Sequence, residues 1–161
     1  MRKELSSDLV LYFSDLFPAR FGQKGMPHHA LLGIGGNIGE VKRRFHKLTA
    51  ILRHHPRINL LATAPILKNP PFGFLDQPDF FNSVILVETT FAPKELLLFC
   101  FWLERRFKRR RTFKNAPRTL DVDIIFYDDI SIDTKDLQIP HPHWWERESV
   151  IIPLRFLEGG R

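Results

Sequence analysis

One short segment of the chain alternates strictly between apolar and acidic residues. Leu120, Val122 and Ile124 are apolar, and Asp121 and Asp123 stand between them. A repeat of two residues is typical of a half-buried strand, whose side chains point alternately to the core and away from it. Both carboxylates then lie on one face, with their α-carbons about 6.5–7 Å apart. The sequence therefore predicts a strand with an acidic face.

This acid pair is also the best candidate for a metal site. Carboxylates at the spacing of Asp121 and Asp123 can bracket a hard divalent cation, and without a cation their charges repel each other. An isolated pair of this kind is more often a plain feature of the surface. The remaining motifs decide between the two interpretations.

Length and composition suit one soluble globular domain. The chain has 161 residues, of which 43% are hydrophobic. Its longest apolar run, Leu96 to Leu103, is far shorter than the roughly 20 residues that cross a bilayer. The first residues are charged and precede any apolar stretch, so we expect no secretory signal and a cytoplasmic protein. A single cysteine, Cys100, excludes an internal disulfide.

Hydrophobic periodicity predicts the order β-α-β-β-α-β. We expect strands at 30–34, 59–64, 80–89 and 120–127, helices at 41–55 and 93–107, a long loop at 65–79 and a last strand near 150–154. This order predicts the α+β class and a ferredoxin-like α/β sandwich. Its sheet is mainly antiparallel, with the helices packed on one face.

The first 27 residues are expected to form an N-terminal extension, and residues 28–161 a single domain. Leu5, Leu9, Tyr12 and Leu16 share one helical face, which predicts an amphipathic helix over residues 3–17, followed by a linker with glycine and proline.

A strongly basic segment precedes the acidic strand. Between Glu104 and Arg118 lie eight cations and no acid beyond Glu104 itself, and the whole chain has a net charge of +6. Arginine binds phosphate oxygens through bidentate pairs of hydrogen bonds, so a cationic loop beside an acidic strand is suited to a nucleoside triphosphate. Taken alone, this basic segment is equally typical of a solvated helix end or of a patch that binds nucleic acid.

A proline-framed loop offers a candidate site for a flat heterocycle. Residues 69–82 combine three prolines and several phenylalanines with Asn82 at a strand start. Aromatic faces such as Phe72 or Phe80 stack on a planar ring, and the Asn82 amide can pair with its edge. Each phenylalanine alone is more often part of the core.

Two further loops carry candidate residues. The run Gly35-Gly36-Asn37-Ile38-Gly39 lacks the spacing of a glycine-rich nucleotide loop, so we interpret it as a tight turn that the Asn37 side chain fixes. His141 lies between Pro140 and Pro142 and can donate a hydrogen bond to a phosphate, although such a histidine is often an ordinary surface residue.

Taken together, these motifs resemble one enzyme family. Residues 34–39, the loop at 70–73 with 76–82, the strand at 117–123 and the pair at 140–141 are similar to those of 6-hydroxymethyl-7,8-dihydropterin pyrophosphokinase, and they occur in the family's order. The resemblance implies transfer of pyrophosphate from ATP to the pterin hydroxymethyl group, with release of AMP, in folate biosynthesis.

The resemblance also implies roles for individual residues. Asp121 and Asp123 would hold two Mg²⁺ ions and act in catalysis with Arg109 and Arg118. The pterin would be bound by Pro71, Phe72, Phe80 and Asn82. The ATP co-substrate would be bound by Gln77, Glu104, Arg109, Arg111, Arg118, His141 and Arg147.

Several positions depart from the family's pattern. Lys108 replaces a glycine, Asn115 and Ala116 replace an aromatic residue and a glycine, and the basic loop is one residue short. Ser149 stands where a phenylalanine usually stacks on the pterin, and we hypothesise that Trp144 or another aromatic residue supplies this second face instead.

Two alternatives remain at this point. A basic ferredoxin-like module can bind RNA, but the aromatic strand motif of such modules is absent and two acids occupy the strand. The second alternative is a member of the family that binds its substrates but does not turn them over. We expect small-molecule partners, no nucleic acid and no membrane, and a monomer, although the sequence does not decide the oligomeric state.

Overall fold

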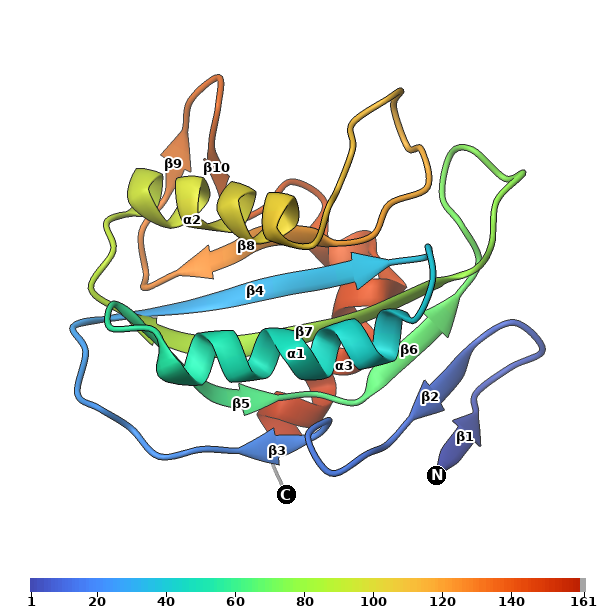
Figure 1. Ribbon diagram of the computed structural model, residues 1–161, viewed down its shortest axis with the longest axis horizontal. Helices are drawn as coiled ribbons and strands as arrows, with labels where there is room; N and C mark the ends of the chain where they lie inside the picture. The colour runs from blue at the N-terminus through green and yellow to red at the C-terminus, as the bar shows by residue number, and fades with distance from the viewer. Residues whose placement is uncertain (160–161) are drawn as a thin grey trace.

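The structure is a computed structural model that describes residues 1–159. Its strands are β1 (Arg2–Glu4), β2 (Val10–Tyr12), β3 (Ala19–Arg20), β4 (His28–Gly36), β5 (Ile58–Thr63), β6 (Ile66–Asn69), β7 (Phe80–Thr89), β8 (Asp121–Tyr127), β9 (Ile132–Asp133) and β10 (Gln138–Ile139) (Figure 1). Its helices are α1 (Val41–His54), α2 (Pro93–Arg106) and α3 (Glu148–Gly159), with a 3₁₀ turn at Trp144–Glu146.

Eight strands form one antiparallel sheet. The order is β1-β2-β6-β7-β4-β8, and β5 pairs with both β7 and β3. Every pairing in it is antiparallel. The predicted α+β class and antiparallel sheet are confirmed. The order β-α-β-β-α-β is also found from β4 to β8, with β6 inserted before β7.

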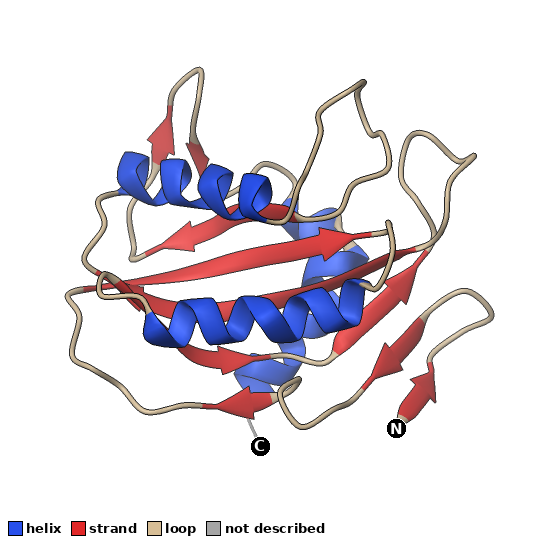
Figure 2. Cartoon of the chain, in the orientation of Figure 1, coloured by secondary structure: helices blue, strands red, loops and turns tan. Residues whose placement is uncertain are grey.

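The two faces of the sheet are covered by different helices. Successive residues of β4 separate cleanly: Leu32 and Ile34 pack with α1 and α2, and Leu31 packs in a second cluster with Val150 of α3. The alternation follows from the two-residue period of a strand. Figure 2 shows α1 and α2 on the near side of the strands and α3 on the far side.

The predicted strand at 150–154 is wrong, because this segment belongs to α3. The run of Val150, Ile151 and Ile152 suggests a strand by composition. However, Val150, Leu154 and Leu157 pack together on the second cluster, which is helical spacing. As a result, the prediction that the helices cover only one face is also wrong.

The predicted N-terminal helix at residues 3–17 is wrong as well. Residues 2–4 and 10–12 form the hairpin β1–β2, and β2 continues the main sheet by pairing with β6. Ser6, Ser7 and Asp8 supply the turn, and such residues favour turns over helix interiors. The division of the chain after residue 27 stays a prediction. Similarly, β6 shortens the expected 65–79 loop to residues 70–79.

We expect Leu11→Ala to lower the free energy of unfolding by about 2–5 kcal/mol. Leu11 is only 1% exposed and belongs to β2, whereas Leu5, in the same hairpin, is 40% exposed. Leu5→Ala is therefore the matched control and should change stability by no more than about 0.5 kcal/mol. Urea denaturation measures both. Equal effects of the two variants would show that β2 is not packed as described.

Candidate active site

The candidate site lies where β7, β4 and β8 run side by side. In the antiparallel register, Gly35 of β4 is opposite Asn82 of β7 on one side and opposite Asp121 of β8 on the other. Gly33 is likewise opposite Asp123. Residues of this parity face the side of the sheet that α3 covers. The register therefore puts the predicted amide and both predicted carboxylates on one face.

Gly35 leaves room for the neighbouring side chain of Asn82. A Cβ at Gly35 would lie 2.3 Å from Oδ1 of Asn82, so a larger residue would force the Asn82 amide to move. Asn82 is in turn held by Asn69, whose Oδ1 accepts a hydrogen bond of 2.7 Å from Nδ2 of Asn82. A glycine at this position lets the backbone come close to a functional side chain.

The two carboxylates have different surroundings. Asp121 accepts a hydrogen bond of 2.9 Å from Arg109 and lies 3.5 Å from Nη1 of Arg118. The carboxylate of Asp123 forms no hydrogen bond or salt bridge within residues 1–159, although the charges of Arg147 and Arg109 act on it. Burial, followed by the nearby charges of Asp121 and Glu104, raises the pKa of Asp123 to about 8. A cation bound beside these two acids would lower that pKa and favour the charged carboxylate.

Glu104, near the end of α2, organises the basic loop. It is 3% exposed. Its carboxylate lies 2.7 Å from Arg111 and 3.2 Å from Arg109, and it accepts a hydrogen bond of 2.9 Å from the Val122 backbone. Burial raises the pKa of Glu104, although the Val122 hydrogen bond and Arg109 act in the opposite direction. Glu104 thus joins the basic loop to β8.

Asn37 holds the surrounding loops together. Its Nδ2 donates 2.9 Å hydrogen bonds to Gln77 and to the Pro78 carbonyl, and its Oδ1 accepts from the Arg118 backbone at 2.9 Å. Gln77 also donates to the Asn115 carbonyl at 2.9 Å. These bonds connect the turn after β4, the 70–79 loop and the basic loop. The prediction that the Asn37 side chain fixes its own turn is wrong, because its hydrogen bonds go to the neighbouring loops instead.

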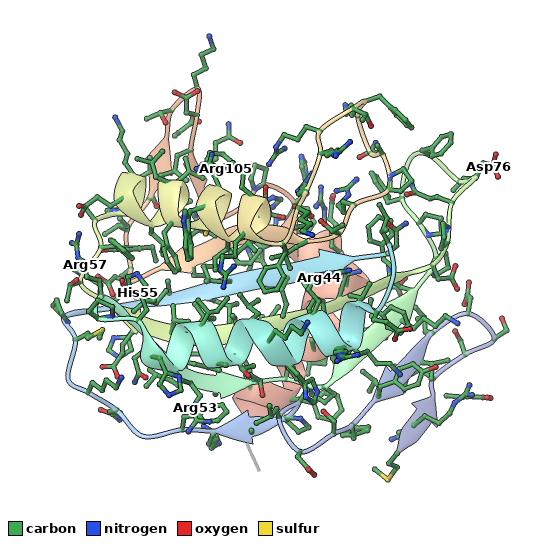
Figure 3. The ribbon with its side chains drawn as sticks, viewed as in Figure 1. Arg44, Arg53, His55, Arg57, Asp76 and Arg105 are labelled. Atoms are coloured by element: carbon green, nitrogen blue, oxygen red, sulfur yellow. The ribbon has the colours of Figure 1, made fainter. Side chains whose placement is uncertain are left out.

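Helix α1 adds one more tie to the same region. Arg44, labelled in Figure 3, donates hydrogen bonds to the carbonyls of Ile38, at 2.9 Å, and Thr119, at 2.7 Å. Arg44 therefore ties α1 to the turn after β4 and to the end of the loop that leads from α2 into β8 (Figure 1).

Three cavities meet at Asp121 and Arg147. We define the aromatic cavity, of about 350 Å³, by Phe72, Phe80, Asn82 and the residues around them. The arginine cavity, of about 300 Å³, is lined by residues 109–118 with Asp121, Asp123 and Arg147. A junction cavity of about 60 Å³ contains both aspartates and His141. All three share Asp121 and Arg147.

Most of the predicted site residues line these cavities. The aromatic cavity contains Pro71, Phe72, Phe80, Asn82, Arg118, Asp121 and Arg147. The arginine cavity contains Arg109, Arg111, Arg118, Asp121, Asp123 and Arg147, and the junction cavity contains His141. Burial is the first cause that lowers the pKa of His141, and Arg147 is the second.

Gln77, Glu104 and Trp144 line none of the three cavities. Gln77 and Glu104 are occupied by the loop contacts described above. The Trp144 ring packs edge-on against Phe126, with centroids 4.8 Å apart. It therefore does not supply the second stacking face that we hypothesised.

Comparison with known proteins agrees with this geometry. The sequence model described as 7,8-dihydro-6-hydroxymethylpterin-pyrophosphokinase matches residues 31–159. The chain belongs to this family. Its relatives include proteins named 2-amino-4-hydroxy-6-hydroxymethyldihydropteridine pyrophosphokinase. The Helicobacter pylori protein is 37% identical over 144 residues, which is 88% of each chain. The Campylobacter jejuni protein is 43% identical over 125 residues, 78% of this chain and 80% of the relative.

Some residues at the site of this pyrophosphokinase family member were missed by the sequence motifs. Asp8 and Leu9 line the aromatic cavity, as do Glu146 and Glu148 beside α3. The predicted helix over residues 3–17 placed Asp8 and Leu9 away from the site, and no motif singled out Glu146 or Glu148. For Asp8 and Leu9, the sequence did contain one indication of a turn, namely the turn-forming residues that precede Leu9.

One departure from the family's pattern has a visible backbone cost. Lys108 has a φ of 63°, in the left-handed region where glycine is favoured. Its backbone nitrogen donates to the Arg105 carbonyl, and the backbone nitrogen of Arg109 donates to Glu104. Lys108, just after the end of α2, thus has the conformation that a glycine would adopt without strain.

The raised pKa of Asp123 predicts a pH-dependent stability. The pKa of the folded protein is about 8, against an ordinary value of 3.8. The folded state therefore binds the extra proton between these values, and the free energy of unfolding falls as pH rises through them. We expect the metal-free wild type to lose stability relative to Asp123→Asn between about pH 5 and about pH 8.

Urea denaturation in the presence of a chelator measures this difference. Asp121, Glu104, Arg109 and Arg147 are the charges that act on Asp123, and they are kept in both proteins. The variant therefore removes the titration of Asp123 and keeps the other charged side chains in place. Parallel pH profiles of the wild type and Asp123→Asn would contradict the assignment.

Proposed function

We propose that this chain uses Asp121 and Asp123 to transfer pyrophosphate from ATP to the hydroxymethyl group of 6-hydroxymethyl-7,8-dihydropterin. The enzyme is a pyrophosphokinase of folate biosynthesis, and its products are AMP and the pterin diphosphate. The observation that carries the assignment of residues is the position of the acid pair. Asp121 lines both the aromatic cavity and the arginine cavity, and Asp123 lines the arginine cavity.

The aromatic cavity suits the pterin. Phe72 is 78% exposed, so its ring is free to stack on a planar ligand. Phe80 lies under the guanidinium of Arg118, at 5.2 Å from the ring centroid. Asn82 can pair with the donors and acceptors at the edge of the pterin. Pro71 belongs to the same wall.

The arginine cavity suits the triphosphate. Nε of Arg109 is buried and has no hydrogen-bond partner among the described residues. A buried donor without a partner is costly, and a phosphate oxygen would satisfy it. Arg111 is 61% exposed in its side chain, although it already pairs with Glu104. We propose that Arg118, His141 and Arg147 complete this binding site.

The acid pair fits two Mg²⁺ ions. Mg²⁺ in nucleotide enzymes usually takes one or two protein carboxylates and completes its shell with phosphate oxygens and water. Asp121 and Asp123 provide two such carboxylates. Residues 1–159 contain no larger cluster, of three or more His, Cys, Asp or Glu side chains, that could hold a metal ion. When bound, the ions would neutralise charge on the transferred group.

The geometry supports a reaction driven by positioning and electrostatics. The pterin hydroxyl oxygen attacks the β-phosphorus of ATP, the bond between the α- and β-phosphates breaks, and AMP leaves. Arginines around the phosphates stabilise the charge that develops during this transfer. The asparagine and the aromatic wall keep the hydroxymethyl group directed at the acid pair.

Localisation and assembly remain predictions. Within residues 1–159, no helix is long and apolar enough to cross a membrane. We propose a cytoplasmic enzyme that acts as a monomer on small molecules, without nucleic acid. A member that has lost turnover remains the alternative, and AMP release with and without the pterin distinguishes the two.

We expect Asp121→Asn and Asp123→Asn each to lower turnover about a hundredfold or more, because each removes charge at the reacting phosphates. The measurement is AMP release from ATP, Mg²⁺ and the reduced pterin. Asp129→Asn is the control, since Asp129 is exposed beyond the other end of β8. Normal turnover in both site variants would refute the proposed metal site.

We expect Arg109→Ala to lower kcat for AMP formation about tenfold or more, with a much smaller change in the KM for pterin. Its proposed partner is the triphosphate, which lies on the other side of the acid pair. Arg105→Ala is the control, because Arg105 is exposed on α2 (Figure 3). A variant with unchanged kcat and raised pterin KM would mean that Arg109 belongs to the pterin site.

A further inference from the structure

The N-terminal hairpin ends in a turn with a defined conformation. The backbone nitrogen of Leu5 donates to the Leu9 carbonyl at 2.8 Å. Inside the turn, the Ser6 hydroxyl donates to Asp8 at 2.9 Å, and the Asp8 backbone nitrogen lies 3.4 Å from the same hydroxyl. We call residues 5–9 the hairpin turn. These bonds give it a fixed shape.

Strand pairing places the hairpin turn against the aromatic cavity. In β2, Val10 is opposite Lys68 and Leu11 is opposite Leu67 of β6. Partner numbers change in opposite directions in an antiparallel pair, so Leu9 follows this register to a place beside Asn69. Asn69 is the residue that holds the Asn82 amide. In Figure 1 the turn lies at the same end of the sheet as the 70–79 loop.

The cavity itself shows the same proximity. Asp8 and Leu9 are among the residues that line it. The apolar residues of this lining are Pro70, Pro71, Phe72, Phe80 and Leu9. All but Leu9 come from the 70–79 loop and the start of β7. Opposite them, α3 contributes the small polar Ser149, so Leu9 is the one apolar group from a different part of the described chain.

From this position we infer that the hairpin turn is a wall of the pterin site and that Leu9 contacts the pterin ring. The inference rests on the proposed function, because it takes the pterin as the occupant of the aromatic cavity. A flat heterocycle gains affinity from apolar contact on more than one side. The family's sequence model begins its match at residue 31, so the hairpin lies outside the matched segment.

The test compares two leucines of the same turn. Leu9→Ala removes the proposed contact, and Leu5→Ala makes the same chemical change at a residue that does not line the cavity. The dissociation constant of reduced hydroxymethylpterin is measured by equilibrium titration with Mg²⁺ and a non-hydrolysable ATP analogue. We expect Leu9→Ala to raise it roughly tenfold, and Leu5→Ala to leave it within about twofold of wild type.

The affinity for the ATP analogue separates a local effect from a general one. It should stay within about twofold in both variants, because the arginine cavity is lined by other residues. Leu9→Met keeps an apolar side chain of similar volume and should restore pterin affinity. The inference is overturned if Leu9→Ala binds pterin as the wild type does, if Leu5→Ala weakens it equally, or if Leu9→Met fails to rescue.

Failure of this inference can be told from failure of the proposed function. A wild-type protein that binds pterin and releases AMP, while Leu9→Ala binds pterin equally well, contradicts only the role of the hairpin turn. A wild-type protein that neither binds pterin nor releases AMP contradicts the proposed function, and the role of Leu9 with it.

Discussion

The register of β7, β4 and β8 is the constraint on which the rest of the site depends. It places Asn82, Gly35 and Asp121 in one row and directs both aspartates to the face that α3 covers. A slip of one residue would turn every side chain of β8 to the other face. Asp121 and Asp123 would then enter the core under α1 and α2, and Val122 would replace them at the cavity.

Charge at the site is balanced by a few buried contacts. Glu104 holds Arg109 and Arg111 close to β8, so the basic loop is oriented before any phosphate binds. Part of the ordering cost of the arginines is therefore already met in the free protein. The carboxylate of Asp123 is different, because it forms no salt bridge among the described residues and its pKa is raised to about 8. This imbalance is what favours a cation at the acid pair.

Sequence patterns predicted the centre of the fold well, because strong periodicity and short motifs act locally. The alternation around Asp121 and the helix beginning at Pro93 were both found as expected. The two ends of the chain were predicted wrongly. The β-branched run that begins at Val150 favoured a strand, but packing against the second cluster of buried residues stabilises a helix there. At Leu9, pairing between β2 and β6 overrode helical spacing, and no local pattern reveals such a long-range partner.

The central claim is that Asp121 and Asp123 bring the metal, the triphosphate and the pterin together. The most direct test is a crystal structure with a non-hydrolysable ATP analogue, the pterin and Mn²⁺, whose anomalous signal locates the ions. We expect the ions within about 2.3 Å of carboxylate oxygens of both residues, between the two ligands. Ions and triphosphate bound away from the acid pair would contradict this account.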